Sequence, residues 1–258
     1  TPQYSRTPGG RLSTAPSCSF HVVRSLPSLL VLFGLPLTAQ SPAAGRGAPA
    51  GDSAGAPAAV RATALPPLLA SPVVRGLYVN RFAAQSTRRM GQLIALADAT
   101  EINAFVIDIK DEFGINYKSA DPALQRNAGN ASTIGELRAL LDTLRSHKIL
   151  AIARIVVFKD SVTARVNPQW TIRKADGAAW RDKQGLAWVN PYHRGLWDYN
   201  VRIAEEVVKM GFGEVQFDYI RFPEPYRSLP TQVFPGSDGR DKSAALAEFL
   251  THAKGRIG

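Results

Sequence analysis

Residues 211–223 read GFGEVQFDYIRFP, and this stretch does most to decide the fold. The apolar residues within 214–220 predict a buried strand, which follows a helix that ends at Gly211. Because side chains alternate along a strand, Gln216 and Asp218 share one face and their apolar neighbours share the other. Burying an unpaired carboxylate is costly, so Asp218 at the end of this strand indicates a partner or a functional role.

Similar strand–helix units precede this stretch. The predicted strands cover 73–79, 102–109, 149–157 and 214–220. One predicted helix begins at Ser86 or Thr87 and ends near Thr100, one begins at Ser132 or Thr133 with Glu136 in a capping position, one runs from Tyr192 to Met210, and one runs from Lys242 to about Lys254. Apolar strands separated by helices indicate a parallel sheet covered on both faces.

Two α/β architectures compete for this pattern, a doubly wound open sheet and a (β/α)8 TIM barrel. No glycine-rich phosphate-binding motif follows any predicted strand, which disfavours a nucleotide-binding sheet. Polar residues gather instead at the C-terminal ends of the later strands, where a barrel keeps its active site. Residues 73–258 hold about four of the eight β/α units. We therefore expect the N-terminal half of a barrel, truncated before its second half.

The first 72 residues are expected to lie outside the barrel. Arg24 precedes an apolar run that ends in Ala39, as in a secretory signal, and the run is shorter than the ~20 residues of a membrane span. The alternative is a hydrophobic segment in misread upstream sequence. We expect 1–39 to be an upstream extension with a signal peptide and 40–72 to be an Ala/Gly/Pro-rich disordered linker. The protein would be secreted, periplasmic or cell-envelope associated, with no stable membrane span after cleavage.

Charge and cysteine content exclude several classes of protein. The net charge is +10, but residues 1–75 carry six basic and one acidic residue and residues 76–258 carry 25 and 20, so each part contributes +5. No basic stripe or nucleic-acid motif occurs in the folded part, so no nucleic-acid partner is predicted. Its small excess weakly favours an acidic glycan or envelope surface. The single cysteine, Cys18, and four histidines without ligand spacing predict no disulfide framework, metal site or cofactor.

A charged constellation is expected at the mouth of the barrel. The second, third and fourth strands are neighbours in a barrel, and side-chain alternation places Arg154 between Asp108 and Asp218. The same alternation places Lys110 on the face of Asp108. Asp218 would then be a nucleophile or general base, held ionised by Arg154. The alternative is an Asp–Arg–Asp network that only fixes the order of the strands.

The connection after the third strand is unusually long. It runs from 158 to 191, whereas ordinary connections of this kind have about 2–6 residues. Its aromatic residues could stack on sugar rings, or they could form a satellite core under the loop, as large aromatics are mostly buried. Trp188 beside Asn190 is the stronger candidate for a sugar contact, and Trp170 and Trp180 are the weaker ones. Charged residues that follow the second and third strands are further candidates, with solvated loop charge as the alternative; they are Lys110, Asp111, Lys159 and Asp160.

These motifs together resemble a known family. The segments RGLYV (75–79), FVIDIKD (105–111), VFKD (157–160), WVNPY (188–192) and 211–223 occur in this order. The set is similar to DUF4015, a bacterial family of glycoside-hydrolase-like TIM barrels with D-Y-I-R-[FY]-P motifs, over about residues 73–225. The resemblance implies a secreted or envelope-associated barrel that acts on polysaccharide. By analogy with retaining α-glycosidases, it implies that Asp218 is the nucleophile.

We therefore predict a glycoside hydrolase that cleaves a polysaccharide or cell-envelope glycan. Such enzymes use two carboxylates, and the acid is expected on a later strand, with Asp108 or Asp111 as candidates in this chain. The alternative is a non-catalytic carbohydrate- or cell-wall-binding barrel. The predicted catalytic residues are Asp218 and Asp108, and the predicted substrate-binding residues are Arg154, Lys110, Asp111, Lys159, Asp160, Trp188, Asn190, Gln216, Tyr219 and Arg221.

Overall fold

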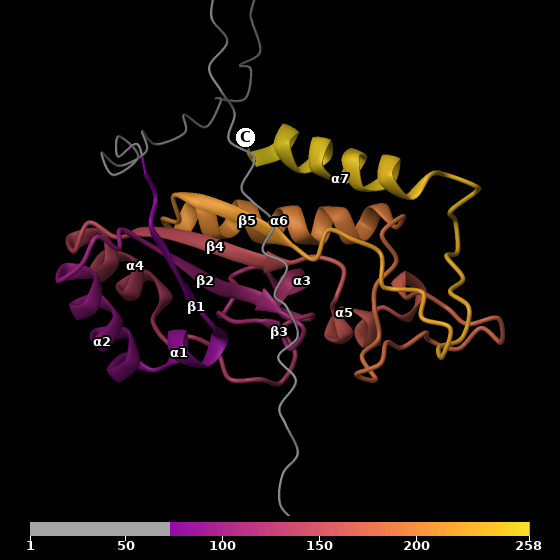
Figure 1. Cartoon of the computed structure of the whole chain (residues 1–258), viewed down its shortest axis with the longest axis horizontal. Coiled ribbons are helices and arrows are strands. Elements are labelled where there is room, and N and C mark those ends of the chain that lie inside the picture. The colour runs from indigo at the N-terminus through magenta and orange to yellow at the C-terminus, as the bar shows by residue number, and fades with distance from the viewer. Residues whose placement is uncertain (1–72, 258) are drawn as a thin grey trace, which may run out of the picture. The chain divides into compact units, whose positions relative to one another are not determined.

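The computed structural model describes residues 73–257, so the predicted signal peptide and linker lie outside the described residues. Four parallel strands form the sheet, in the order β1-β2-β4-β5, and a short strand pairs antiparallel with β2 (Figure 1). Their bounds are β1 (Gly76–Val79), β2 (Ala104–Asp111), β3 (Gly114–Ile115), β4 (Leu150–Val156) and β5 (Glu214–Asp218). The predicted parallel sheet is confirmed.

Helices connect successive parallel strands and one long helix follows the last. They are α1 (Arg81–Gln85), α2 (Thr87–Asp98), α3 (Pro122–Gln125), α4 (Leu137–Ser146), α5 (Ser161–Val166), the 3-10 turn η2 (Pro168–Trp170), α6 (Arg194–Met210) and α7 (Lys242–Ile257). Helices α6 and α7 lie side by side, where Trp197 packs edge-on against Phe249 (Figure 1). No described helix is both long enough and apolar enough to cross a membrane.

The order of the strands in space follows their order in the chain. A doubly wound sheet reverses its order at a switch point, and the described strands contain no such reversal. The described helices pack their apolar residues into one core with the strand side chains of a single face, including Phe105 and Ile107. On the opposite face, Ala104, Leu150 and Ile152 form a separate small cluster. The expectation of helices on both faces is therefore wrong for residues 73–257. One-sided cover fits a barrel wall, and the complete barrel stays a prediction.

Local capping explains most of the helix boundaries. Ser86 caps α2 by accepting a hydrogen bond from the backbone of Arg89 at 3.2 Å, as predicted. Gly211 ends α6 with a φ of 121°, which glycine adopts readily, also as predicted. The helix expected from Ser132 or Thr133 begins only at Leu137. The earlier residues are held extended, because the Ser132 carbonyl accepts from Arg81 at 2.9 Å and Ile134 forms a β-bridge with Tyr117.

The long connection between β4 and α6 packs around its own small core. Trp180 is fully buried there, and its Nε1 donates to the carbonyl of Pro230 at 2.8 Å. Trp170 is half-buried and packs against His193 and Tyr199. The satellite-core interpretation is therefore confirmed for Trp180, and this core fixes the end of the connection that contains Trp188.

Candidate active site

Four polar side chains form a row across the sheet, one from each long strand. Tyr78 on β1 donates its hydroxyl to Asp108 Oδ2 on β2 at 2.6 Å. Arg154 on β4 donates from Nη1 to Asp108 Oδ1 at 2.6 Å and from Nε to Asp218 Oδ2 on β5 at 2.9 Å. The predicted position of Arg154 between the two aspartates is confirmed.

The register of the strands produces this row. Asp108 lies opposite Arg154, and Asp218 lies opposite Val156, two residues closer to the C-terminal edge. Arg154 therefore extends toward that edge to reach Asp218. The Asp108 side chain is 5% exposed and that of Asp218 is 39% exposed. Asp218 is thus the carboxylate of the row that a ligand at this edge can reach.

The backbone after β5 fixes the second oxygen of Asp218. The Tyr219 N–H donates to Asp218 Oδ1 at 2.6 Å. Tyr219 has a φ of 53°, in the left-handed region that few non-glycine residues adopt. Such backbone strain is often found at functional sites, where the surrounding structure holds it in place. Both oxygens of Asp218 therefore have defined directions.

Two members of the row keep fixed protonation states over a wide pH range. Burial lowers the pKa of Arg154, but the charges and hydrogen bonds of Asp108 and Asp218 outweigh it, and the net effect raises this pKa. Burial, and then the hydrogen bond to Asp108, raise the pKa of Tyr78 well above its ordinary value. Tyr78 therefore remains a hydroxyl donor and Arg154 remains a cation.

Aromatic and basic side chains gather beside Asp218, as expected. The Tyr219 ring lies 5.2 Å from Lys159 Nζ and 5.3 Å from Arg221 Cζ, measured to the ring centre. Trp188 packs edge-on against Tyr219 with ring centres 5.8 Å apart, and its Nε1 donates to Asp182 at 2.9 Å. Trp188 is buried, so it supports Tyr219 while Tyr219 and Arg221 are more accessible.

Lys110 and Asp160 lie away from this row. The register slips between Asp108 and Lys110, so that Lys110 pairs opposite Ile155 and turns toward the helices. The expectation that Lys110 shares the face of Asp108 is therefore wrong, because a β-bulge breaks the alternation. Lys110 Nζ lies 2.8 Å from Asp160 Oδ2, and both side chains are fully buried. Asp160 also caps α5 through the Thr163 N–H at 2.8 Å.

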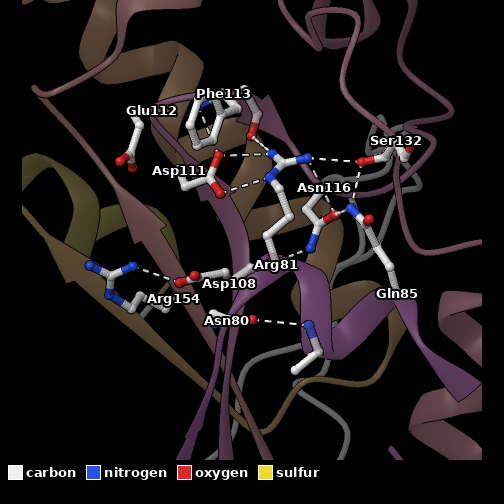
Figure 2. Close-up of polar contacts among 12 residues, drawn as sticks. Asn80, Arg81, Gln85, Asp108, Asp111, Glu112, Phe113, Asn116, Ser132 and Arg154 are labelled. Carbon is white, nitrogen blue, oxygen red and sulfur yellow. Dashed lines mark hydrogen bonds and ion pairs between the residues drawn. The ribbon is translucent and has the colours of Figure 1, made fainter. Parts of the chain in front are cut away.

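Asp111 is bound to a buried arginine that the sequence analysis did not single out. Figure 2 shows Arg81 at the centre of a polar network beside the end of β2. Its Nε and Nη2 donate to the two oxygens of Asp111 at 2.7 and 2.8 Å, and Nη2 also donates to the Gly114 carbonyl at 2.6 Å. Phe113 N–H takes a further acceptor position on Asp111 Oδ1 at 2.9 Å. The network anchors the turn between β2 and β3 and keeps Asp111 away from the Asp218 edge.

Two predicted amide side chains have different surroundings. Asn190 is buried; its Nδ2 donates to the Pro235 carbonyl at 2.8 Å and its Oδ1 accepts from the Tyr192 N–H at 3.1 Å. It therefore ties the long connection to the segment after β5. Gln216 is half-buried, lies opposite Arg154 and has no side-chain hydrogen bond to another residue within 73–257. Its amide is therefore free to bind a ligand.

Tyr78 is the site residue that sequence analysis missed. It is 55% exposed, and its ring centre lies 5.4 Å from Arg154 Cζ. Alternation along β1 and the pairing of Tyr78 with Val106 place it on the face of Asp108, so the signal was present. Among the described residues, no three His, Cys, Asp or Glu side chains gather closely enough to hold a metal ion.

Comparison with known proteins gives a family and several structural relatives. Residues 76–258 match the family DUF4015, described as "Putative glycosyl hydrolase domain". The crystal structure of a hypothetical protein from Ruminiclostridium thermocellum ATCC 27405 is 35% identical, with a TM-score of 0.64; the match covers 70% of this chain and 93% of that chain. No curated protein matched.

Two glycosidase structures are more distant. An α-galactosidase from Thermus thermophilus is 13% identical with a TM-score of 0.49, covering 72% of this chain and 36% of that chain. A GH20 exo-β-N-acetylglucosaminidase from Vibrio harveyi is 18% identical with a TM-score of 0.49, covering 71% of this chain and 33% of that chain. This chain therefore spans about a third of each of these two proteins.

Proposed function

The chain belongs to the DUF4015 family of glycosyl hydrolase-type domains, and from this premise we propose that it hydrolyses glycosidic bonds with Asp218 as the catalytic carboxylate. One observation carries the proposal. Asp218 is a partly exposed carboxylate at the C-terminal end of β5, and Arg154 and the Tyr219 N–H fix the directions of its two oxygens. Active sites of barrel enzymes lie at this end of the strands.

The geometry suits attack on, or stabilisation of, an anomeric carbon. Glycosidases pass through an oxocarbenium-like transition state, which a nearby carboxylate stabilises or captures. Holding that carboxylate in one orientation removes part of the entropic cost of reaching the transition state. Arg154 supplies this constraint from one side of Asp218 and the Tyr219 backbone from the other.

We assign Asp108 the role of a positioning residue. Its carboxylate is buried and accepts hydrogen bonds from Tyr78 on one oxygen and from Arg154 on the other. It can therefore orient Arg154, and through it Asp218, without contact with the sugar. We retain the expectation that the proton donor comes from a later strand of the complete barrel, as the two-carboxylate mechanism requires.

The substrate in this proposal is a polysaccharide or cell-envelope glycan, and the protein acts outside the cytoplasm. Gln216 offers a free amide for a sugar hydroxyl, and the Tyr219 ring offers an apolar face. A non-catalytic carbohydrate-binding barrel is the second candidate. It is favoured by the full engagement of Asp218, because both oxygens already accept hydrogen bonds within the chain.

Hydrolysis assays with an Asp218→Asn variant separate the two functions. We expect the full chain to release reducing ends from at least one glycan in a panel of envelope and extracellular polysaccharides. Asp218→Asn should lower that rate by roughly 10²–10⁴ while glycan binding persists. Asp176→Asn, at an exposed carboxylate of the same long connection, is the matched control and should leave the rate unchanged. Binding without hydrolysis in the wild-type chain would favour the non-catalytic function.

A further inference from the structure

A buried cation that no carboxylate neutralises lies beside the proposed catalytic residue. Lys159 follows β4, and only 8% of the residue is exposed. Its Nζ donates to Gln184 Oε1 at 2.8 Å and lies 5.2 Å from the centre of the Tyr219 ring. Within the part of the chain that the structure describes, no aspartate or glutamate forms an ion pair with it. Two of its three N–H donors therefore have no hydrogen-bond acceptor there.

Lys110 shows how the same fold neutralises a structural lysine. It is buried at the end of the neighbouring strand β2, and its Nζ lies 2.8 Å from Asp160 Oδ2 and donates to the Val156 carbonyl. Burying an ammonium without a counter-charge costs free energy, so buried lysines are usually paired in this way. Lys159 departs from that pattern in a site that opens toward Asp218.

The surroundings of Lys159 join it to the site. It lies over the ring of Tyr219, the residue that directly follows Asp218 and whose N–H binds the catalytic carboxylate. Arg221 adds a second cation 5.3 Å from the same ring, although Glu224 pairs with it at 2.9 Å on the exposed side. A sugar stacked near Tyr219 would therefore meet the unpaired ammonium of Lys159.

We propose that Lys159 binds an anionic substituent, a carboxylate or a sulfate, on a sugar next to the scissile bond. The preferred substrate is then an acidic glycan. This inference rests on the proposed function, because it takes the sugar to be bound at Asp218. Either anion supplies oxygen acceptors for the two free N–H donors and the counter-charge that the chain omits. A neutral sugar supplies the acceptors without the charge.

Binding measurements on the full chain test this preference without turnover. Calorimetry would compare galacturonate, glucuronate and sulfated galactan oligosaccharides with their neutral counterparts. We expect at least one acidic member to bind about tenfold or more tightly than its counterpart, the range of one charge-assisted hydrogen bond. Lys159→Gln should abolish this difference and leave neutral affinity within about twofold, and Lys159→Arg should restore part of it. The acidic member that depends on Lys159 identifies the anion as carboxylate or sulfate.

Lys174→Gln is the matched control. Its ammonium pairs with Asp176 on the same long connection, so its removal should leave the acidic preference intact. The proposal is overturned if no acidic oligosaccharide binds more tightly than its neutral counterpart, or if Lys159→Gln weakens both equally.

Salt dependence gives a second readout that needs no variant. Acidic affinity should fall between about 50 and about 500 mM salt while neutral affinity stays constant, because only the former includes an ion pair. Two equal salt responses would overturn the proposal even if Lys159→Gln fails to fold. A Lys159-dependent acidic preference in a chain that hydrolyses nothing would support this inference and contradict the proposed function.

Discussion

Arg154 donates two hydrogen bonds to a single oxygen of Asp218, from Nε at 2.9 Å and from Nη2. The second oxygen of Asp218 thereby remains for the Tyr219 N–H, and the plane of the carboxylate is set from two directions. The third guanidinium nitrogen binds Asp108 at 2.6 Å. One arginine thus links a buried carboxylate to an accessible one, and the predictions below begin from this link.

Replacement of Arg154 by Met should damage both stability and turnover. It leaves Asp108 buried without its cation, which should lower the free energy of unfolding by about 3 kcal/mol or more. The loss of orientation at Asp218 should lower kcat by about a hundredfold with a smaller change in KM. Urea unfolding and steady-state kinetics measure the two effects. Arg145→Met, at an exposed pair with Asp142, should change stability by less than about 1 kcal/mol; an equal loss in both variants would refute the assigned role of Arg154.

Replacement of Tyr78 by Phe tests the far end of the row. The ring remains beside Arg154, but the 2.6 Å hydrogen bond to Asp108 is lost. We expect a loss of about 1–2 kcal/mol in the free energy of unfolding, because the acceptor is a carboxylate. Tyr226→Phe, at an exposed tyrosine, is the control and should be neutral. Identical unfolding curves for wild type and Tyr78→Phe would show that this hydrogen bond contributes nothing.

Alkaline titration should divide the tyrosines into two groups. Burial is the largest cause that raises the pKa values of Tyr78, Tyr117 and Tyr199 above the ordinary value near 10. Since the folded state holds these protons more tightly, the stabilisation is complete below pH 10 and is lost as the pH rises above it. Absorbance near 295 nm should show some of the seven tyrosines ionising only on unfolding. Seven superimposed titrations in the native chain would contradict the buried hydroxyl contacts.

Asp111→Asn separates an anchoring role from a substrate-binding role. Asp111 accepts both hydrogen bonds of the Arg81 fork, so its neutralisation should destabilise the chain by about 3 kcal/mol. Because the carboxylate does not face the Asp218 edge, glycan KM should remain unchanged at temperatures where the variant is folded. A raised KM with unchanged stability would instead place Asp111 in the substrate site, as the sequence had suggested.

Side-chain alternation was enough to predict the centre of the site. Asp108 and Arg154 lie on regular stretches of neighbouring parallel strands, so their shared face followed from the period of two. The same rule failed at Lys110, because one extra residue in β2 reverses the alternation. Nothing local in the sequence marks that bulge, and the ion pair of Lys110 with Asp160 depends on how β2 and β4 come together.

Long-range contacts also decided the features that local signals misplaced. Ser132 and Thr133 are good helix-capping residues, yet Arg81 binds the Ser132 carbonyl from about fifty residues earlier in the chain and α4 begins only at Leu137. Asp111 was predicted to face the barrel mouth, and the same arginine holds it elsewhere. Sequence patterns therefore predicted the strands and the Asp–Arg–Asp row, while the buried arginine network became visible only in the folded chain.

Chemical rescue of an Asp218→Gly variant tests the catalytic role of Asp218 most directly. The measurement is the rate of hydrolysis of a glycan that the wild-type chain cleaves, with and without added sodium azide. The account predicts that the variant loses turnover because the carboxylate is gone, and that azide, which can occupy the vacated space and attack the anomeric carbon, restores turnover and forms a glycosyl azide. Wild-type turnover by Asp218→Gly without azide would contradict it.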